Sequence, residues 1–484
     1  MSLKAPPTIL ELAVKNLLGN QDFTISVLQE MPTEFFPSLF KEAFNRRCMR
    51  ILPALVSSWP FACLPVGAMM KVPDVMILQA VLAGIDMLLT QKVHLRSSKL
   101  QVLDLRNEHN RFWDVWAGLE GLACSKGMLS EEQKCKGLPR YALRQPLKVV
   151  TDFELKAELD EQQAYLLQWA QQQKRSVKLY CMKMTICETS VELIKAVLKT
   201  FPQDSVEELE LSRNWSLATL SRFAPCLGQM RNLHKLHLDR IDMYTDIGTN
   251  PLTDREEKRE SKFMSKIFKL NCLRHLSMNY IFFSGQLLKH LCRSMMCPVE
   301  SLSIQGCLLS EPDLEHLCLW PRLYQLKHLK LHGLSLLNLS PTHLQFLLEK
   351  VSDSLQTLEL QHCLISDSQL RALLPALSKC SKLNRVNFFD NDISTSLLKD
   401  LLHCMANLST LTEEFYPAPL ECYDQGGLVL LMDRFANLCP DLLNILRSKR
   451  HPKKGSFGTT FCHKCLRRCI YDLRTGFCPC HKKR

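Results

Sequence analysis

The sequence lacks the segments that direct a protein to a membrane or anchor it there. Its first residues, Met1–Pro7, show no basic start followed by an apolar run, so we expect no secretory signal. The most apolar window, 75–89, is short and contains Gln79 and Asp86, which makes it unsuited to span a bilayer. We therefore expect a protein of the cytoplasm or nucleus, in which most of the 22 cysteines are reduced and buried.

The common catalytic motifs are absent as well. The chain has no Gly-rich phosphate loop, no His-Glu-x-x-His and no Gly-x-Ser-x-Gly. Its 15 histidines are scattered, and several fall on expected strands, where a surface role is far commoner than that of a base. We expect a protein that is not an enzyme.

The body of the chain also lacks a basic surface, although the net charge is +12. Residues 447–484 contain twelve Lys or Arg and one acidic residue, so their net charge is 12 − 1 = +11 and the other 446 residues are nearly neutral. We expect no nucleic-acid partner for the body, and only weak binding through the tail. The start of this tail, 447–455, fits a nuclear-import signal or a solvated linker equally well.

One motif is present many times. Val206, Leu209 and Leu211 have the form L-x-x-L-x-L, and further copies begin at Leu233, Leu273, Val299, Leu326, Leu355 and Leu383, with a decayed copy at Leu408. From Leu273 onward the starts are 26, 27, 29, 28 and 25 residues apart. A period in the twenties with this motif indicates leucine-rich repeats.

Each copy predicts one short strand that lies parallel to the next. The segments between copies, such as 341–350 and 368–377, carry apolar residues at helical spacing and suit the crossovers that parallel strands need. Stacked units of this kind predict an α/β solenoid, a curved horseshoe with strands on the concave side and helices on the convex side. We predict its first strand at 100–106, a polar insertion at 242–262 and a closing helix at 426–447.

The chain is therefore predicted to have three regions. Residues 1–95 form a helical N-terminal region, 96–446 the solenoid with its capping helix, and 447–484 a basic, Cys-rich tail.

The predicted concave face has polar residues of mixed charge. Strand side chains alternate, so the residues beside the inward-pointing leucines face outward in two rows. We predict a protein partner on this face, whereas a merely solvated face is the alternative. The residues that would contact the partner are Lys235, His237, His328, Lys330, Thr357, Glu359 and Arg385.

The tail contains two cysteine pairs that could hold a metal. Cys462 with Cys465, and Cys478 with Cys480, supply four thiolates, the ligand set of a closed structural zinc site, and Cys469, His463 and His481 are alternative ligands. The tail has little apolar material, so metal binding would have to supply its folding energy. A disordered basic tail with reactive thiols is the alternative.

Several stretches of the chain resemble one known family. The runs Leu28–Phe40, Ser58–Gly67 and Leu100–Arg106, with Trp113 and the ending Cys462-x-x-Cys465, are similar to the PRAME family, preferentially expressed antigen in melanoma and its relatives. The resemblance implies a leucine-rich-repeat protein of germ-line or early-embryo type. It also implies either a substrate receptor of a cullin-2 ubiquitin ligase or a repressor of transcription by nuclear receptors, including the retinoic acid receptor.

Two N-terminal segments match docking motifs of such ligase receptors. Thr8, Ile9, Ala13 and Leu17 fit an elongin-C-binding box, with Ile9 where leucine is usual. The spacing places the last three on one stripe of a helix, for which Thr8 would be the N-cap with Glu11 as its capping-box partner.

The second segment has the form of a cullin-2 box and contains Met31, Pro32, Phe35 and Leu39. We predict an adaptor that presents a protein target to a cullin-2–elongin ligase. The alternatives are that both segments only cover the first repeat, or that the chain is a corepressor without ligase function.

Overall fold

The fold is known from a computed structural model. It describes residues 8–70, 74–90, 98–108, 113, 146–187, 189–242, 254–267, 269–281, 287–424, 429–449, 454–461 and 467–472. The chain forms two compact units, of which the first comprises Met1–Met184 with Glu192–Val206 and the second Thr185–Val191 with Glu207–Arg484.

The first unit begins with helices and continues into parallel strands. Its elements are α1 (Ile9–Gly19), α2 (Gln21–Val27), α3 (Phe35–Asn45), α4 (Ile51–Ser57), β1 (Cys63–Pro65), α5 (Val75–Thr90), β2 (Val102–Asp104), β3 (Leu147–Leu155), α7 (Glu161–Gln172), β4 (Val177–Cys187) and α8 (Val191–Leu198). The first strand is therefore β1, before the predicted 100–106, and it pairs in parallel with β2. Three residues ending in proline carry too little of the repeat motif to be recognised in the sequence.

Aromatic residues form the core of the first unit. Trp59 is completely buried and packs edge-to-face on Phe36 and Phe40. Trp113 stacks on Phe40, and its indole N–H donates to Pro65 O at 2.8 Å. Trp113 is thus a core residue with a satisfied polar atom.

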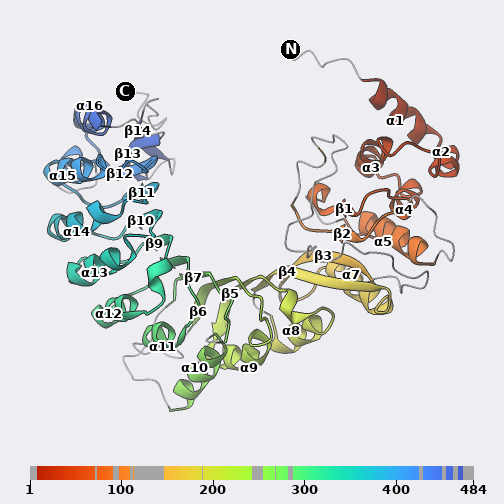
Figure 1. Ribbon diagram of the computed structural model, residues 1–484, viewed down its shortest axis with the longest axis horizontal. Helices are drawn as coiled ribbons and strands as arrows, with labels where there is room; N and C mark the ends of the chain where they lie inside the picture. The colour runs from red at the N-terminus through yellow and green to blue at the C-terminus, as the bar shows by residue number, and fades with distance from the viewer. Residues whose placement is uncertain are drawn as a thin grey trace, which may run out of the picture. The chain divides into compact units, whose positions relative to one another are not determined.

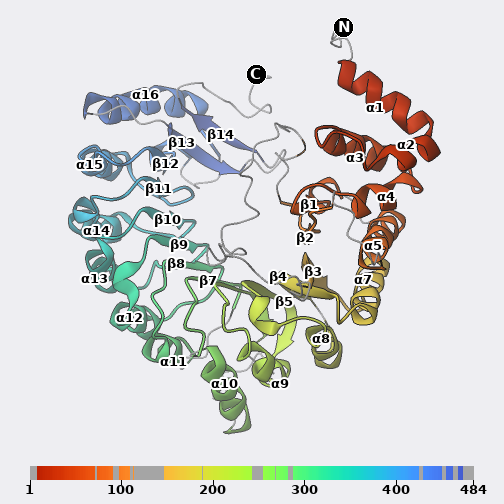
Figure 2. The same ribbon diagram turned by 45° about the vertical axis from the view of Figure 1, so that its right-hand side comes forward.

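The second unit alternates strands and helices. The strands are β5 (Glu208–Ser216), β6 (Lys235–Asp242), β7 (His275–Asn279), β8 (Ser301–Gln305), β9 (His328–His332), β10 (Thr357–Gln361), β11 (Arg385–Asn387), β12 (Glu413–Pro417), β13 (Lys454–Phe461) and β14 (Arg468–Tyr471). The helices are α9 (Leu217–Leu227), α10 (Asp254–Ile267), α11 (Leu287–Ser294), α12 (Glu311–Leu319), α13 (Pro341–Val351), α14 (Asp367–Lys379), α15 (Thr395–Met405) and α16 (Met432–Lys449). Within this unit each strand pairs with the next one in chain order, and the helices stack along the outer side of the strands (Figures 1 and 2).

The register of the second unit confirms the predicted repeat. From β5 to β13 neighbouring strands are parallel, and Leu209, Leu236, Leu276 and Leu302 occupy one row in consecutive strands. These leucines are at most 1% exposed. The fold is therefore an open parallel α/β sheet built of leucine-rich repeats.

The segment 242–262 is not a polar insertion throughout, as the sequence suggested. Its second half belongs to α10, which runs from Asp254 to Ile267. Phe263 and Met264 of this helix are 1% exposed, so α10 supplies the helix between β6 and β7. The apolar residues lie at the end of a strongly charged run, which hid the helical pattern.

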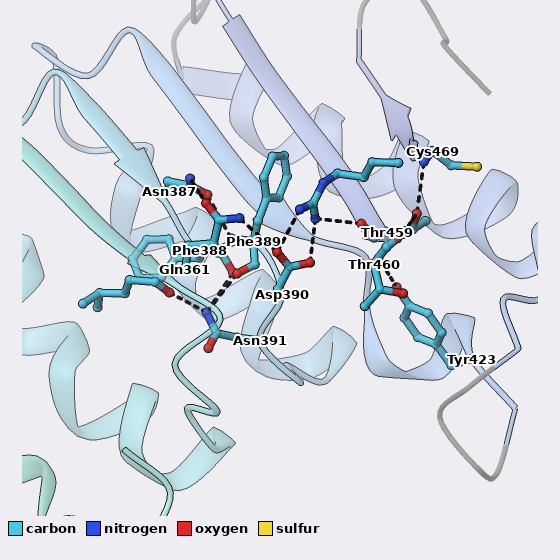
Figure 3. A network of polar contacts seen from close by, with 12 residues as sticks. Gln361, Asn387, Phe388, Phe389, Asp390, Asn391, Tyr423, Thr459, Thr460 and Cys469 are labelled. Carbon is cyan, nitrogen blue, oxygen red and sulfur yellow. Dashed lines mark hydrogen bonds and ion pairs between the residues drawn. The ribbon is translucent and has the colours of Figure 1, made fainter. Parts of the chain in front are cut away.

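The sheet continues beyond residue 446, where the sequence analysis ended the solenoid. β13 pairs in parallel with β12, and β14 returns antiparallel to β13. Arg468 of β14 donates two hydrogen bonds to Asp390, at 2.6 and 2.8 Å, and both side chains are nearly buried (Figure 3). Its guanidinium lies over the rings of Phe389 and Phe461. This contact fastens the end of the sheet to the turn after β11.

Candidate protein-interaction site

A groove lies among the first three helices. It has a volume of about 580 Å³ and is lined by Ala13, Asn16, Leu17, Asn20, Phe23, Val27, Glu30, Met31, Pro32 and Phe35. The two docking segments predicted from the sequence are thereby brought to one place. Most of the lining is apolar, with amides and one carboxylate among it, as is common for protein-binding grooves.

The predicted elongin segment forms α1 with the expected cap. Thr8 Oγ1 accepts from Glu11 N–H at 3.2 Å, and Glu11 accepts from Thr8 N–H at 2.8 Å. The two apolar stripes of the helix have different surroundings. Val14 and Leu18 are buried, whereas Ile9 is 87% exposed. Folding therefore buries one stripe, whereas on the other Ile9 is exposed and Ala13 and Leu17 are half-buried.

The predicted cullin segment is divided between surface and core. Pro32 is exposed, Met31 and Phe35 are half-buried, and all three line the groove. Leu39 is fully buried in α3 and does not line the groove, so direct contact of its side chain with a partner is contradicted. The spacing of the motif could not reveal that α3 turns this residue into the core.

Helix α2 also contributes to the groove, although neither motif of the sequence includes it. Phe23 and Val27, one helical turn apart, line the groove, and Phe23 is 55% exposed. Leu12 of α1 is a further exposed apolar residue, at 53%. An apolar pair at i and i+4 on a short polar helix was the signal that could have identified Phe23 and Val27.

The predicted concave residues do lie in two rows on one face. The first row, Glu208, Lys235, His275, Ser301, His328, Thr357 and Arg385, and the second, Glu210, His237, Ser277, Ser303, Lys330, Glu359 and Asn387, follow the strand registers from β5 to β11. The sequence pattern thus predicted the geometry of this face correctly; its partner stays a prediction.

Charged groups of the concave face already interact with one another. Glu359 pairs with Lys330 at 3.4 Å and with Arg385 at 3.2 Å, and Arg385 also pairs with Glu413. Lys235 pairs with Glu208 at 3.1 Å in the same way. A partner would have to compete with these ion pairs or bind around them.

Two histidines of this face, His275 and His328, have lowered pKa values. Burial, and after it the charge of Lys330, lowers the pKa of His328. His328 Nδ1 and Thr357 Oγ1 lie 3.0 Å apart. Burial and Lys235 likewise lower the pKa of His275. The face therefore offers neutral hydrogen-bonding groups between charged pairs.

The predicted zinc ligands Cys462, Cys465, Cys478 and Cys480 lie outside the described residues, so this site stays a prediction. Over the described ranges, no cluster of three or more His, Cys, Asp or Glu could hold a metal ion. No helix among the residues placed in the structure has the length and apolarity to cross a membrane.

Comparison with known proteins gives matches along nearly the whole chain. The chain matches the PRAME N-terminal domain over residues 6–113 and the PRAME C-terminal domain over 147–480. It is 44% identical to human PRAME family member 12 over 479 residues, which is 99% of this chain and 98% of the relative. Human PRAME family member 8 is 42% identical over 481 residues, 99% of this chain and 100% of the relative.

A search of solved structures matched an internalin from Listeria monocytogenes. The identity is 16%, and the match covers 56% of this chain and 80% of that one. The TM-score of 0.24 is too low for the match to bear on the fold. The two domain matches and the full-length relatives confirm the resemblance seen in the sequence: the chain belongs to the PRAME family.

Proposed function

We propose that the chain is a non-enzymatic adaptor that docks on the elongin–cullin-2 ubiquitin ligase through α1–α3 and presents a protein target for degradation. The observation that carries this proposal is the groove in which Ala13 and Leu17 of the elongin segment meet Met31, Pro32 and Phe35 of the cullin segment. If the two motifs only covered the first repeat, we would expect these residues to be buried in the core instead of lining a groove.

The exposed stripe of α1 supports the same proposal. Ile9 and Leu12 face solvent while Val14 and Leu18 hold the helix on the unit, so the outward apolar residues are not needed for folding. A partner helix or groove that covers such anchors gains the apolar area that folding left exposed. Small Ala13 lets the partner approach closely.

The test is copurification from cells. Ile9→Ser with Leu17→Ser should abolish recovery of the elongins, because truncation of buried anchors commonly weakens such interfaces by about 2 kcal/mol or more each. Pro32→Ala with Phe35→Ser should lose cullin-2 and keep the elongins. Lys15→Ser on the same helix is the control and should lose neither.

Equal recovery of elongins with the wild type and with the Ile9/Leu17 variant would show that elongins do not dock at this groove. A corepressor that binds a nuclear receptor without ligase function would then be the better account.

A further inference from the structure

The turns that follow four strands of the second unit each carry an exposed leucine. Leu308, Leu337, Leu364 and Leu420 follow β8, β9, β10 and β12 and are 65%, 54%, 39% and 44% exposed. One exposed leucine is ordinary, but three of these leucines follow the neighbouring strands β8, β9 and β10 at the same ends. Leu420 lies two strands beyond Leu364, because the segment after β11 carries no leucine. We call Leu308, Leu337, Leu364 and Leu420 the carboxyl-end ridge.

The turns of the ridge are held to one another by hydrogen bonds. Leu336 N–H donates to Cys363 O at 3.0 Å, and Leu420 N–H donates to Ile393 O at 2.9 Å. Between them, Asn391 Oδ1 accepts from Cys363 N–H at 3.1 Å. The ridge is therefore preformed, and a partner need not order it on binding.

The backbone at Leu364 has an unusual conformation for a leucine. Its φ is +52°, in the left-handed region that disfavours a leucine. The residue directly after β10, His362, also has a positive φ, as Gly306 and Gly333 do after β8 and β9. Leu364 is 39% exposed, so part of its side chain is available to a partner.

Acidic residues occur in the segments that follow these strands. The first turns of the helices and the adjoining turns contribute Glu311, Asp367, Asp392 and Glu421. Three of them also accept backbone hydrogen bonds from an adjacent repeat: Glu311 from Ser340 at 2.9 Å, Asp367 from Ser394 at 3.0 Å and Glu421 from Thr395 at 2.8 Å.

Two basic groups lie close to these acids. His343 Nδ1 is 2.7 Å from Glu311 Oε1, and Arg434 donates to Glu421 O at 3.3 Å. They leave Asp367 and Asp392 unmatched by a cation in the contacts described, so the ridge is acidic. A basic partner is therefore the electrostatic complement.

We propose that the carboxyl-end ridge binds a basic amphipathic helix of another protein. Neighbouring parallel strands are about 4.8 Å apart and a helix rises about 5.4 Å per turn, so apolar residues on three successive helical turns would meet Leu308, Leu337 and Leu364. A residue two turns further on would meet Leu420, because β11 contributes no leucine. An extended peptide repeats on one face every ~6.7 Å and fits this spacing less well. Lysines or arginines beside the apolar stripe would contact Asp367 and Asp392.

The test uses full-length protein and two synthetic helical peptides with the same leucine stripe. One peptide has lysines on its flanks and the other has glutamates, and fluorescence anisotropy measures binding of each. The lysine peptide should bind at least roughly tenfold tighter than the glutamate peptide. Equal binding of the two peptides would overturn the proposal.

Matched variants locate the binding site. Leu337→Ser with Leu364→Ser should weaken the lysine peptide by roughly tenfold or more, without changing the charge. Leu319→Ser with Tyr324→Ser is the control, because these residues are 58% and 47% exposed but lie before β9, at the opposite ends of the strands. The same loss in both variants would show non-specific adhesion and overturn the proposal.

Two other occupants would also overturn it. Dimers in sedimentation experiments that disappear with the Leu337/Leu364 variant would assign the ridge to a second copy of the chain. Tighter peptide binding by more than roughly tenfold after removal of residues 473–484 would assign it to the chain's own basic tail.

A charge variant, Asp392→Asn, should flatten the salt dependence of lysine-peptide binding. An unchanged salt dependence would contradict the proposed contact between Asp392 and the basic residues of the peptide.

Discussion

The surface of the first three helices differs from the concave face of β5–β11 in the kind of side chain that it exposes. The helices leave Ile9, Leu12 and Phe23 more than half exposed around an open groove. On the concave face Lys330 and Arg385 already form ion pairs with Glu359 of the same chain. Apolar surface that folding leaves uncovered gains free energy on association, whereas charges that are already paired must lose partners to bind. The difference favours α1–α3 as the stronger docking site.

The largest effect on stability is expected at the end of the sheet, at Arg468, and only a small one at Ile9 of α1. Arg468→Met leaves Asp390 buried without its cation, which should cost about 3–5 kcal/mol in the opening free energy of β13 and β14. Ile9→Ser should change that of α1 by less than about 0.5 kcal/mol, because the side chain is 87% exposed. Hydrogen exchange measures both opening free energies. A decrease of less than about 1 kcal/mol for Arg468→Met would contradict a stabilising role of the Arg468–Asp390 ion pair.

An intermediate effect is expected for binding at the concave face. Changing His328, Lys330 and Glu359 together to alanine should reduce recovery of a target about tenfold in proximity labelling, as truncation of a contact surface does. Elongin recovery should not change, because α1–α3 is intact. If every labelled protein is recovered equally from this variant and the wild type, the concave face is not the target site.

The two units should also respond to pH with opposite sign. Desolvation by the surrounding protein, only partly offset by Arg106, raises the pKa of Asp152 in the first unit to about 6. The side chain is exposed on β3, so solvent screening keeps the effect on stability small. A raised folded-state pKa means that stability from this group is present at low pH and is lost as pH rises from about 4 to 6. Burial alone would raise the pKa of Asp390 in the second unit too, but the bonds and charge of Arg468 outweigh it and lower that pKa. The contribution of Asp390 to the stability of the folded state is therefore present above about pH 4 and is lost at lower pH.

Paired variants separate these contributions. At pH 7, Asp152→Asn should increase protection of β3 amides from exchange, and Asp390→Asn should decrease that of β13. Near pH 4 the gain from Asp152→Asn should disappear, since the wild-type carboxyl is then protonated. A gain at pH 4 as large as at pH 7 would exclude the raised pKa as its cause.

The smallest effect is expected within the concave ladder. Glu359→Gln removes the shared partner of Lys330 and Arg385, whose side chains are 45% and 39% exposed. Solvent screens such pairs, so the opening free energy of β10 should fall by no more than about 1 kcal/mol. A larger fall would mean that the ladder stabilises the face far more than its exposure suggests.

The repeated motif predicted the sheet because its leucines have no other place than the core. Leu209 and its equivalents, the strand registers and the two concave rows all follow from alternation along the strands. The pattern was insufficient where an element carried few motif residues, as in β1, or where charge hid an apolar face, as in α10.

The candidate site was predictable in part for a similar reason. Motif spacing identified α1 and the start of α3, but spacing does not show which side of a helix the fold covers. Leu39 is therefore core although it fits the cullin motif, and Phe23 lines the groove although it belongs to no motif. The adaptor role and the zinc site of the tail stay predictions.

Hydrogen exchange of the full-length chain with and without purified elongins tests the central claim most directly. We expect slower exchange in α1–α3 when elongins are bound, with the slowest exchange around Leu17, and unchanged exchange in β6–β11. We also expect that Ile9→Ser with Leu17→Ser abolishes the protection. Protection of the concave strands with none in α1–α3, or no protection anywhere at saturating elongin, would contradict docking at the groove.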